Sequence, residues 1–308
     1  MNYRLHLSYL LIAIFCLLLG GCSGSSSASR KEHSGPPRDS TPKVLTPSAD
    51  GVTVYQNDFA SIDASNTSQG YVMVKYNGTN EKVKLQITCP DQSCYTYLIS
   101  DRGAYDTFPL TAGNGSYALQ VLENVAGDTY TVSLAQSINV NIEDEFLPFL
   151  YPNQYVNFHT DSKAVSKGSD LAKDTYSDLD VVQNIYNYVI KNISYDTEKA
   201  QNVSYGYVPD IDDTLSSKKG ICFDYAALMA SMLRSQNIPT KLEVGYSGDA
   251  YHAWISTYID DKGWVDDIIQ FNGDTWQIMD PTLAATNDSA AVKKYIGDGS
   301  HYVVKYTY

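Results

Sequence analysis

One cysteine stands where a reactive thiol would be expected. Cys222 begins the apolar stretch 220–233 (GICFDYAALMASML), whose hydrophobic residues recur at helical spacing. We therefore predict a helix that has Cys222 in its first turn and Arg234 in its last turn and that stops before Pro239. At the start of a helix, unpaired backbone amides and the positive end of the dipole stabilise a thiolate. A free cysteine is also often simply buried, so this position alone leaves an inert thiol open.

Two later residues could complete a nucleophilic site. His252 lies near the start of an apolar stretch, 251–258, and Asp280 follows another, 276–279; we predict a strand at each. A thiol nucleophile needs a base, and the base needs an acid that orients it. The chain supplies these residue types in the order cysteine, histidine, aspartate.

Four segments in this half of the chain resemble the transglutaminase-like superfamily: GICFDYAALMASMLRSQNIPTKLEVGY, YHAWISTYI, GWVDDI and WQIMDPT. The resemblance covers about residues 165–308. It implies a papain-like core, in which the helix with the cysteine packs on an antiparallel sheet with the histidine and the aspartate. It also implies that Cys222 is the nucleophile, His252 the general base and acid, and Asp280 the residue that orients the imidazole.

The resemblance implies attack of the thiolate on an amide carbonyl of a protein or peptide substrate. The backbone amide of Cys222 would donate to the oxyanion, and Tyr195 and Tyr225 are candidates for the second donor, although either hydroxyl could be satisfied locally instead. The thioester is resolved by water in a protease or amidase and by a lysine amine in a transglutaminase. No site for a lysine donor is recognisable, so we favour hydrolysis.

Two other interpretations compete with an enzyme. Cysteine, histidine and aspartate are residue types that zinc accepts, but no close ligand pair accompanies them. An acidic calcium cluster is not evident either, so we predict no metal and no other cofactor. The second alternative is a non-catalytic surface protein that binds a partner or serves as a scaffold, because folds outlast their chemistry.

The elements before this half alternate with period two. Residues 71–76, 82–87, 117–121 and 130–134 read as strands, with turn signals such as Asn77-Gly78 between them. We predict a small antiparallel β-sandwich over residues 49–141. The fold class expected for the whole chain is therefore α+β.

Residues 142–164 join the two halves, and the catalytic domain is expected over residues 165–308. The linker is rich in proline and aromatic residues, so we expect it to pack between the halves rather than form a helix. A role in the substrate groove is the alternative. Beyond it, apolar residues at helical spacing follow Ser177, with Asp180 three residues on, which predicts a capped helix.

The N-terminus carries an export signal. Residues 1–21 contain Arg4 and a short apolar run, 10–19, which is too short to span a bilayer. The sequence that ends at Cys22 resembles the lipobox of bacterial lipoproteins, which implies lipid attachment at Cys22 and an extracytoplasmic protein anchored to the cell membrane. An ordinary secreted protein is the alternative. Residues 22–48 are polar and rich in serine and proline, and predict a flexible tether.

The net charge bears on possible binding partners, and the remaining cysteines bear on possible disulfides. The chain has 22 basic and 35 acidic residues, a net charge of −13, which argues against nucleic acid as a partner because phosphate contacts need clustered basic residues. Cys89 and Cys94 are close enough in sequence to form a disulfide outside the cytoplasm, or to remain two free thiols. Cys222 is then the odd thiol, which in an exported protein is either reactive or sealed in the core.

Overall fold

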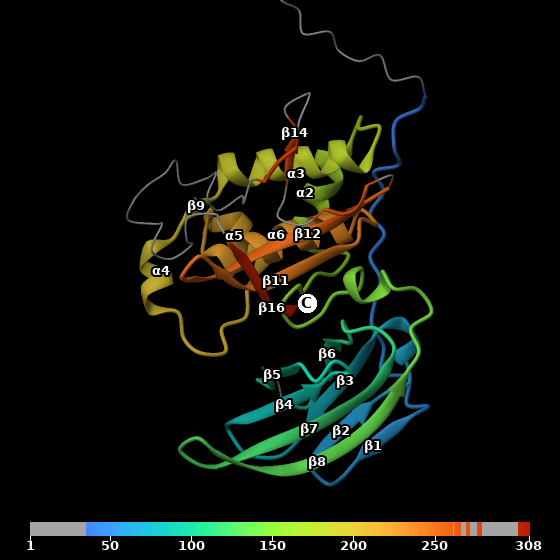
Figure 1. Ribbon diagram of the computed structural model, residues 1–308, viewed down its shortest axis with the longest axis vertical. Coiled ribbons are helices and arrows are strands. Elements are labelled where there is room, and N and C mark those ends of the chain that lie inside the picture. The colour runs from blue at the N-terminus through green and yellow to red at the C-terminus, as the bar shows by residue number, and fades with distance from the viewer. Residues whose placement is uncertain (1–34, 101, 261, 266–268, 272–275, 279–300) are drawn as a thin grey trace, which may run out of the picture. The chain divides into compact units, whose positions relative to one another are not determined.

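The computed structural model describes residues 35–100, 102–260, 262–265, 269–271, 276–278 and 301–308. Residues 37–308 form one compact unit. The signal segment, Cys22 and Asp280 lie outside the described residues, so the predictions about them stay predictions. The chain has a mixed architecture of helices and antiparallel sheets (Figure 1).

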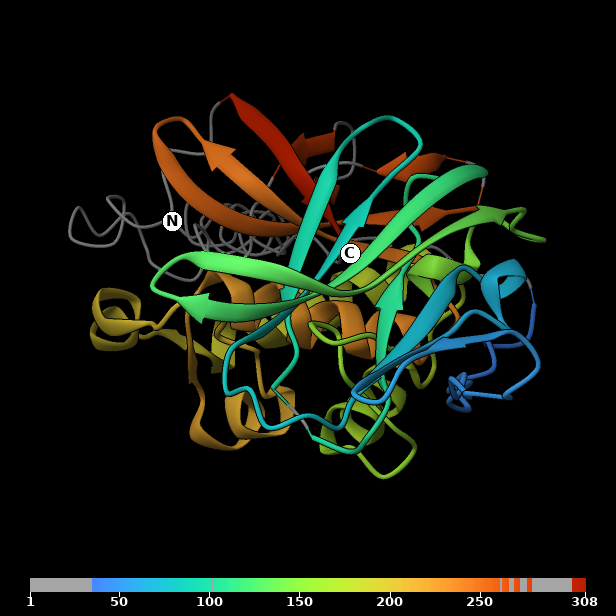
Figure 2. The ribbon, with the colours of Figure 1, turned by 90° about the horizontal axis from the view of Figure 1, so that it is seen from below.

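The N-terminal β region, residues 54–140, contains two four-stranded antiparallel sheets (Figures 1 and 2). The order in the first sheet is β1 (Val54–Gln56), β2 (Ala60–Asp63), β3 (Tyr71–Tyr76) and β6 (Asp106–Pro109). The order in the second is β5 (Cys94–Leu98), β4 (Val83–Thr88), β7 (Gly115–Ala126) and β8 (Thr129–Val140). A 3-10 turn, η1 (Thr67–Gln69), precedes β3.

Alternating burial explains these strands. In β4 the side chains of Val83, Leu85 and Ile87 are buried, while the residues between them are partly exposed. Because successive side chains of a strand point to opposite faces, each strand gives one apolar face to the interior. The period-two prediction is confirmed here, with the predicted strand 71–76 matching β3 residue for residue.

The two neighbouring cysteines of this region are both free thiols. Cys89 follows β4 and is buried, whereas Cys94 begins β5 and is exposed. The Cys89 amide donates to the Ser93 carbonyl at 2.9 Å, so Cys94 is one residue past its direct partner and points to the other face. The structure therefore does not join the two sulfurs that the sequence offered as a disulfide.

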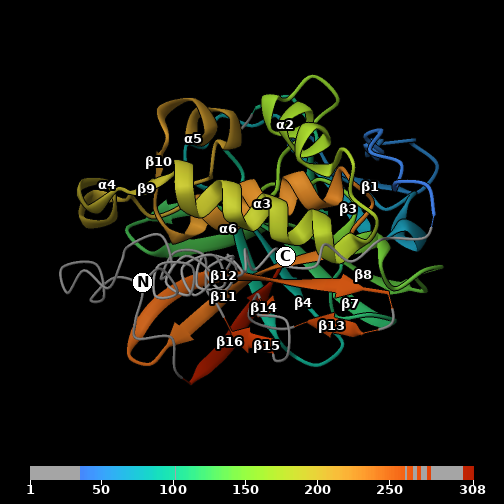
Figure 3. The same ribbon diagram turned by 90° about the horizontal axis from the view of Figure 1, so that it is seen from above.

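The C-terminal region, residues 163–308, places helices over an antiparallel sheet (Figure 3). Its helices are α2 (Lys163–Ala172), α3 (Asp178–Asn192), α4 (Thr197–Asn202), α5 (Ile211–Ser217) and α6 (Cys222–Arg234). Its main sheet has the order β13 (Gly263–Val265), β12 (Ala250–Ile259), β11 (Thr240–Ser247) and β16 (Tyr302–Thr307). Two small sheets pair β9 (Ser194–Tyr195) with β10 (Lys219–Gly220), and β14 (Ile269–Phe271) with β15 (Trp276–Ile278).

Helix α6 is the centre of this region. It contacts α2, α3 and α5 on one side and β11 and β12 on the other, and Figure 3 shows α6 between α3 and the sheet. All its residues from Asp224 to Arg234 are buried, as expected for a helix that is covered all round. None of the helices in the described residues is long and apolar enough to cross a membrane.

Local signals account for the start of α3. The Ser177 hydroxyl accepts a hydrogen bond from the Asp180 amide at 3.2 Å, and the Asp180 carboxylate accepts one from the Ser177 amide at 2.9 Å. This reciprocal capping box satisfies backbone donors that the first turn leaves unpaired. The predicted cap and helix are confirmed.

A buried arginine fixes the end of α6. The Arg234 guanidinium is fully buried and donates to the backbone oxygens of Thr240 at 2.9 Å, Tyr151 at 2.7 Å and Tyr308 at 2.8 Å. Burial lowers the pKa of Arg234 to about 9. These three carbonyls belong to β11, to the linker and to the segment after β16. The Arg234 side chain therefore connects the end of α6 with three other parts of the chain.

The linker packs against the sheet, as its composition predicts. Before α2 begins at Lys163, its only helical part is the short 3-10 turn η2 (Leu147–Phe149). The Phe146 ring lies 4.3 Å from that of Tyr258, and the Phe149 ring lies 5.3 Å from that of Trp264. These contacts seat the linker on β12 and β13.

Tyrosines join the β region to the C-terminal region. On β5, the Tyr95 ring lies 5.3 Å from Tyr306 and 5.7 Å from Tyr308, and the Tyr97 ring lies 5.8 Å from Tyr308. Tyr155 of the linker completes the cluster, with its ring 5.7 Å from Tyr97 and 4.7 Å from Tyr308. Such pairs add to the burial of their large apolar faces and hold β5 against the end of β16.

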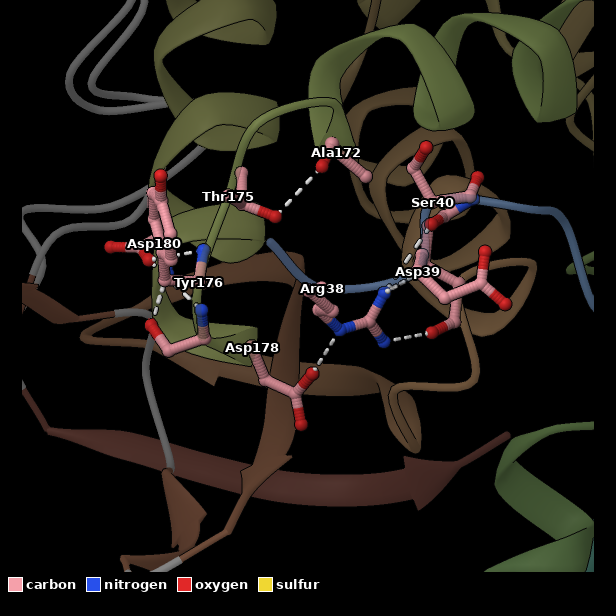
Figure 4. A network of polar contacts seen from close by, with 10 residues as sticks. Arg38, Asp39, Ser40, Ala172, Thr175, Tyr176, Asp178 and Asp180 are labelled. Carbon is pink, nitrogen blue, oxygen red and sulfur yellow. Dashed lines mark hydrogen bonds and ion pairs between the residues drawn. The ribbon is translucent and has the colours of Figure 1, made fainter. Parts of the chain in front are cut away.

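Part of the predicted tether is fastened to the C-terminal region (Figure 4). The Arg38 guanidinium donates to the Asp178 carboxylate at 2.6 Å and to the backbone oxygen of Gln236. The Arg38 and Lys43 amides donate to backbone oxygens near the ends of α2 and α6. Residues 35–48 form no helix or strand, but hydrogen bonds to the helix ends hold Arg38 and Lys43 in place, whereas the sequence predicts a flexible tether over residues 22–48.

Candidate active site

Cys222 is the first residue of α6, within the first turn that the sequence predicts for it. Ile221 precedes it as the N-cap, and the side chain of Cys222 is partly exposed. The thiol therefore lies at the positive end of a thirteen-residue helix and is accessible to a reactant.

A buried carboxylate supports this helix start. Asp224 is fully buried, and its Oδ2 accepts a hydrogen bond from the Ile221 amide at 2.8 Å. A Cβ on Gly220 would lie 2.7 Å from the Asp224 Cβ, so only glycine fits at that position. The glycine and the aspartate of GICFD therefore have structural roles. The Asp224 carboxylate caps the first turn of the helix that carries Cys222, and Gly220 leaves room for the Asp224 side chain.

Lys199 and Tyr207 complete the surroundings of Asp224. The Lys199 Nζ lies 2.8 Å from Asp224 Oδ2, and the Tyr207 hydroxyl donates to Asp224 Oδ1 at 2.5 Å. Burial, and then the hydrogen bond to Asp224, raise the pKa of Tyr207, so its hydroxyl keeps its proton at neutral pH. We call these three residues the Asp224 cluster; it fastens α4 and the loop after it to the start of α6.

His252 lies on β12 and is almost completely buried. It pairs across the sheet with Gly245 of β11, and its ring stacks near that of Trp254 at 6.1 Å. The strand predicted around His252 is confirmed. Its position in the middle of a packed sheet restricts the imidazole to few orientations, which a general base requires.

Cys222 and His252 line the same cavity. Its volume is about 440 Å³, which falls in the range of small-molecule and substrate sites. The lining is largely aromatic and apolar; besides Cys222 and His252 it includes Tyr155, Tyr195, Tyr205, Tyr207, Phe223, Tyr251 and Tyr308. Burial raises the pKa of Tyr251, so its hydroxyl keeps its proton at neutral pH. A thiol at a helix start and an imidazole on a strand thus line one cavity that is open to solvent.

The two tyrosines predicted as oxyanion donors have different surroundings. Tyr195 lines the cavity, and its backbone pairs with Gly220 next to the α6 start. Tyr225 is fully buried, and its hydroxyl donates to the Ile193 carbonyl at 2.7 Å. A hydroxyl has one proton to donate, so Tyr225 is committed to this structural bond, which contradicts its candidacy as an oxyanion donor.

The third predicted catalytic residue, Asp280, lies outside the described residues. Among the residues that the structure describes, no group of three or more histidine, cysteine, aspartate or glutamate side chains is arranged to hold a metal ion. The zinc alternative includes Asp280, so it remains a question for metal analysis.

Several residues of the site carried no signal in the sequence. Lys199 and Tyr207 come from a polar stretch without periodicity, Tyr155 from the linker, and Thr96 and Leu98 from a strand of the β region. A lysine, a tyrosine or a leucine at such a position looks the same whether or not it faces a cavity. The one available hint was the alternative that the linker contributes to a substrate groove, and Tyr155 lies in the cavity wall.

Comparisons with known proteins agree with this geometry. Residues 166–266 match the sequence model of the transglutaminase-like superfamily. The UPF0252 protein MJ1282 of Methanocaldococcus jannaschii is 30% identical over 118 residues. That match covers 33% of this chain and 34% of the other, so the chain spans about a third of the length of this relative. The segment that matches this superfamily, residues 166–266, includes Cys222 and His252.

Two solved structures are distantly similar. The periplasmic domain of TgpA from Pseudomonas aeruginosa has a TM-score of 0.37 at 14% identity, and covers 78% of this chain and 97% of its own. A candidate cysteine protease from Cytophaga hutchinsonii has a TM-score of 0.36 at 15% identity, and covers 75% of this chain and 69% of its own.

Proposed function

We propose that this chain is a thiol enzyme that attacks amide bonds of proteins or peptides, with Cys222 as nucleophile, His252 as general base and acid, and Asp280 as the residue that orients the imidazole. The observation that carries the proposal is that Cys222, at the start of α6, and His252, on β12, line one cavity. The match of residues 166–266 to the transglutaminase-like superfamily supports it.

The first half of the reaction forms a thioester. His252 takes the proton of the Cys222 thiol, and the sulfur forms a bond to the carbonyl carbon of the amide. The backbone amide of Cys222 donates to the oxyanion that develops. The carbon–nitrogen bond then breaks, and the amine leaves with the proton that His252 held.

The second half decides the product. In hydrolysis, His252 takes a proton from water, the resulting hydroxide attacks the thioester, and the thiol leaves with that proton, which yields a carboxylic acid and free Cys222. In cross-linking, a lysine amine takes the place of water and a new amide forms. We favour hydrolysis, because the sequence contains no recognisable site for a lysine donor and water needs none.

The proposal extends to location. An N-terminal export signal and the resemblance of the sequence ending at Cys22 to a lipobox favour an extracytoplasmic enzyme held at the cell membrane by a lipid. The polar residues that follow Cys22 would separate the enzyme from the membrane surface.

Alkylation of Cys222 tests the nucleophile. We expect iodoacetamide to label Cys222 rapidly at pH 6, and His252→Ala to slow this labelling at least about tenfold, because the thiolate loses its base. Cys94, an exposed thiol of the same chain, is the internal control. Peptide mapping by mass spectrometry resolves the two sites. Equal rates at Cys222 and Cys94 would contradict an activated thiol and favour the scaffold alternative.

Product mass separates the two reactions. The full chain is incubated with a glutamine-containing peptide and a labelled primary amine, and Cys222→Ala serves as the inactive control. Hydrolysis gives acid products without the label, whereas incorporation of the amine would overturn our preference for hydrolysis.

A further inference from the structure

The β region contributes to the cavity that contains Cys222. Thr96 and Leu98, both on β5, line it together with Tyr155 of the linker and the loop 203–207. The β region otherwise has no chemical constellation, and the sequence suggests only packing or adhesion for it. Because Thr96 and Leu98 form part of the cavity wall, the β region can contribute to substrate selection.

This wall is built by close packing. Gly206 has a φ of +80°, and a Cβ at this position would lie 2.0 Å from the Leu98 Cδ1, so the backbone of the loop rests directly on the leucine. The Lys84 ammonium, on β4, lies 5.6 Å from the Tyr205 ring. At the other end of the loop, the Asp224 cluster holds Tyr207. The loop is therefore supported by the β region on one side and by the start of α6 on the other.

The residues that line the cavity disfavour a charged substrate side chain. Apart from the site residues Cys222 and His252, the described residues that line the cavity include no aspartate, glutamate, lysine or arginine. A charged substrate side chain would lose its hydration without gaining an ion partner, which is strongly unfavourable. A large apolar side chain would instead gain about 1.5–3 kcal/mol from burial.

The rim is apolar as well. Val203, Tyr205 and Tyr251 line the cavity and are 42%, 75% and 56% exposed, respectively. Large hydrophobic side chains exposed together around a cavity are typical of a binding site rather than of ordinary surface. The apolar character thus continues from the cavity to its mouth.

We propose that this cavity binds a large uncharged side chain, aromatic or branched aliphatic, of the peptide whose amide Cys222 attacks, and that Leu98 of the β region forms part of the selecting wall. The identity of the attacked amide rests on the proposed function. The binding preference does not, because it follows from the shape and charge of the cavity alone.

Binding without chemistry tests this inference. The full chain with Cys222→Ala is titrated calorimetrically with blocked peptides Gly-Gly-Xaa-Gln-Gly, in which Xaa is Phe, Leu, Ala, Asp or Lys. We expect Phe and Leu to bind at least about tenfold more tightly than Ala, Asp or Lys. Adding Leu98→Asp should remove that preference, and the milder Leu98→Ala should reduce it. Leu134→Ala is the matched control, since Leu134 is a partly buried leucine of the same β region outside the cavity wall.

The outcomes separate this inference from the proposed function. Equal binding of all five peptides, or a preference unchanged in folded Leu98→Ala, would overturn the inference even if Cys222 reacts as an activated thiol. A preference for Phe and Leu that depends on Leu98 would support it even if Cys222 proves inert. Melting curves of each variant show whether it is folded.

Discussion

The two regions of the molecule bury different kinds of side chain. The interior of the N-terminal β region is almost wholly apolar, with Ser61, Asp63 and Thr107 as its buried polar side chains among the described residues. The C-terminal region buries more charged side chains, among them Asp224, Arg234 and Glu243, whereas Asp63 is the one buried charged side chain among the described residues of the β region. Apolar burial is nondirectional, whereas a buried charge requires partners at defined positions.

The difference bears on how each region works. Alternating apolar side chains are enough to form the sheets of the β region, and many arrangements of similar volume would serve. In the C-terminal region, the start of α6 is held by Asp224, and its end is held by Arg234. Directional contacts therefore fix both ends of the helix that carries Cys222, which is what a reactive group needs.

The largest effect is expected from the buried arginine. Arg234→Met removes the hydrogen bonds to three backbone oxygens, of which that of Tyr308 keeps a second donor, the Leu242 amide at 2.9 Å, and should lower the free energy of unfolding by about 3–5 kcal/mol. Arg102 of the β region is a matched control, because it also donates to three backbone oxygens, at 2.6, 2.8 and 3.2 Å, but is exposed. Arg102→Met should cost about 1 kcal/mol or less. Urea unfolding measures both, and equal losses would refute the contrast between the regions.

A pH-dependent effect is expected in the β region. Burial raises the pKa of the Cys89 thiol from 9.0 to about 11. Between these values the unfolded thiol has lost its proton while the folded thiol retains it, so the stabilisation present below pH 9 is lost as the pH rises through 11. The loss is on the order of 2 kcal/mol.

Cys89→Ala isolates this contribution. Its stability should fall less steeply with pH above 9 than that of the parent, while Cys94→Ala, which changes an exposed thiol, should keep the slope of the parent. Thermal unfolding followed between pH 8 and 11 gives the slopes, and the buried tyrosines contribute alike to all three proteins. A slope unaltered by Cys89→Ala would show that this thiol titrates normally in the folded chain.

A third comparison uses two buried aspartates. Asp224→Asn removes the charge that Lys199 faces, so turnover should fall about tenfold as the start of α6 loses its support. In the β region, Asp63 accepts from the Gly51 and Ser65 amides at 2.8 and 2.9 Å and has neither Cys222 nor His252 near it in the fold. Asp63→Asn should affect stability but leave turnover within about twofold.

The pH dependence of Cys222 alkylation distinguishes a positioning role of Asp224 from a purely structural one. The rate of Cys222 alkylation as a function of pH should change in Asp224→Asn and remain unchanged in Asp63→Asn. In a double-mutant cycle, Lys199→Met should cost less in the Asp224→Asn background than in the parent, because the pair interacts directly. Additive effects would mean that Lys199 and Asp224 act separately.

The smallest effect concerns the segment before β1. Arg38→Met removes a partly buried ion pair with Asp178 and should lower the free energy of unfolding by about 1 kcal/mol. Lys173→Met is the control, because the Lys173–Asp170 pair is mostly exposed, and it should leave the melting temperature unchanged. Equal melting temperatures for all three proteins would indicate that the fastening in Figure 4 adds no stability.

Local signals in the sequence determined much of this protein. Period-two alternation predicted the strands around Tyr71, Leu85 and Leu119, and a serine followed by an aspartate predicted the start of α3. The apolar pattern after Cys222 predicted α6 with the cysteine in its first turn. These features follow from neighbours within a few positions, which is why the sequence alone was sufficient.

The tertiary structure alone decided what surrounds the thiol. Leu98 of β5 and Tyr155 of the linker line the cavity together with Cys222. The Tyr225 hydroxyl donates to the Ile193 carbonyl, and Arg234, in the last turn of α6, is buried and donates to the backbone oxygen of Tyr308. Each of these contacts joins residues far apart in the chain. A side chain carries no local mark of a distant partner, because the partner is chosen by how whole elements pack and not by the spacing of neighbouring residues.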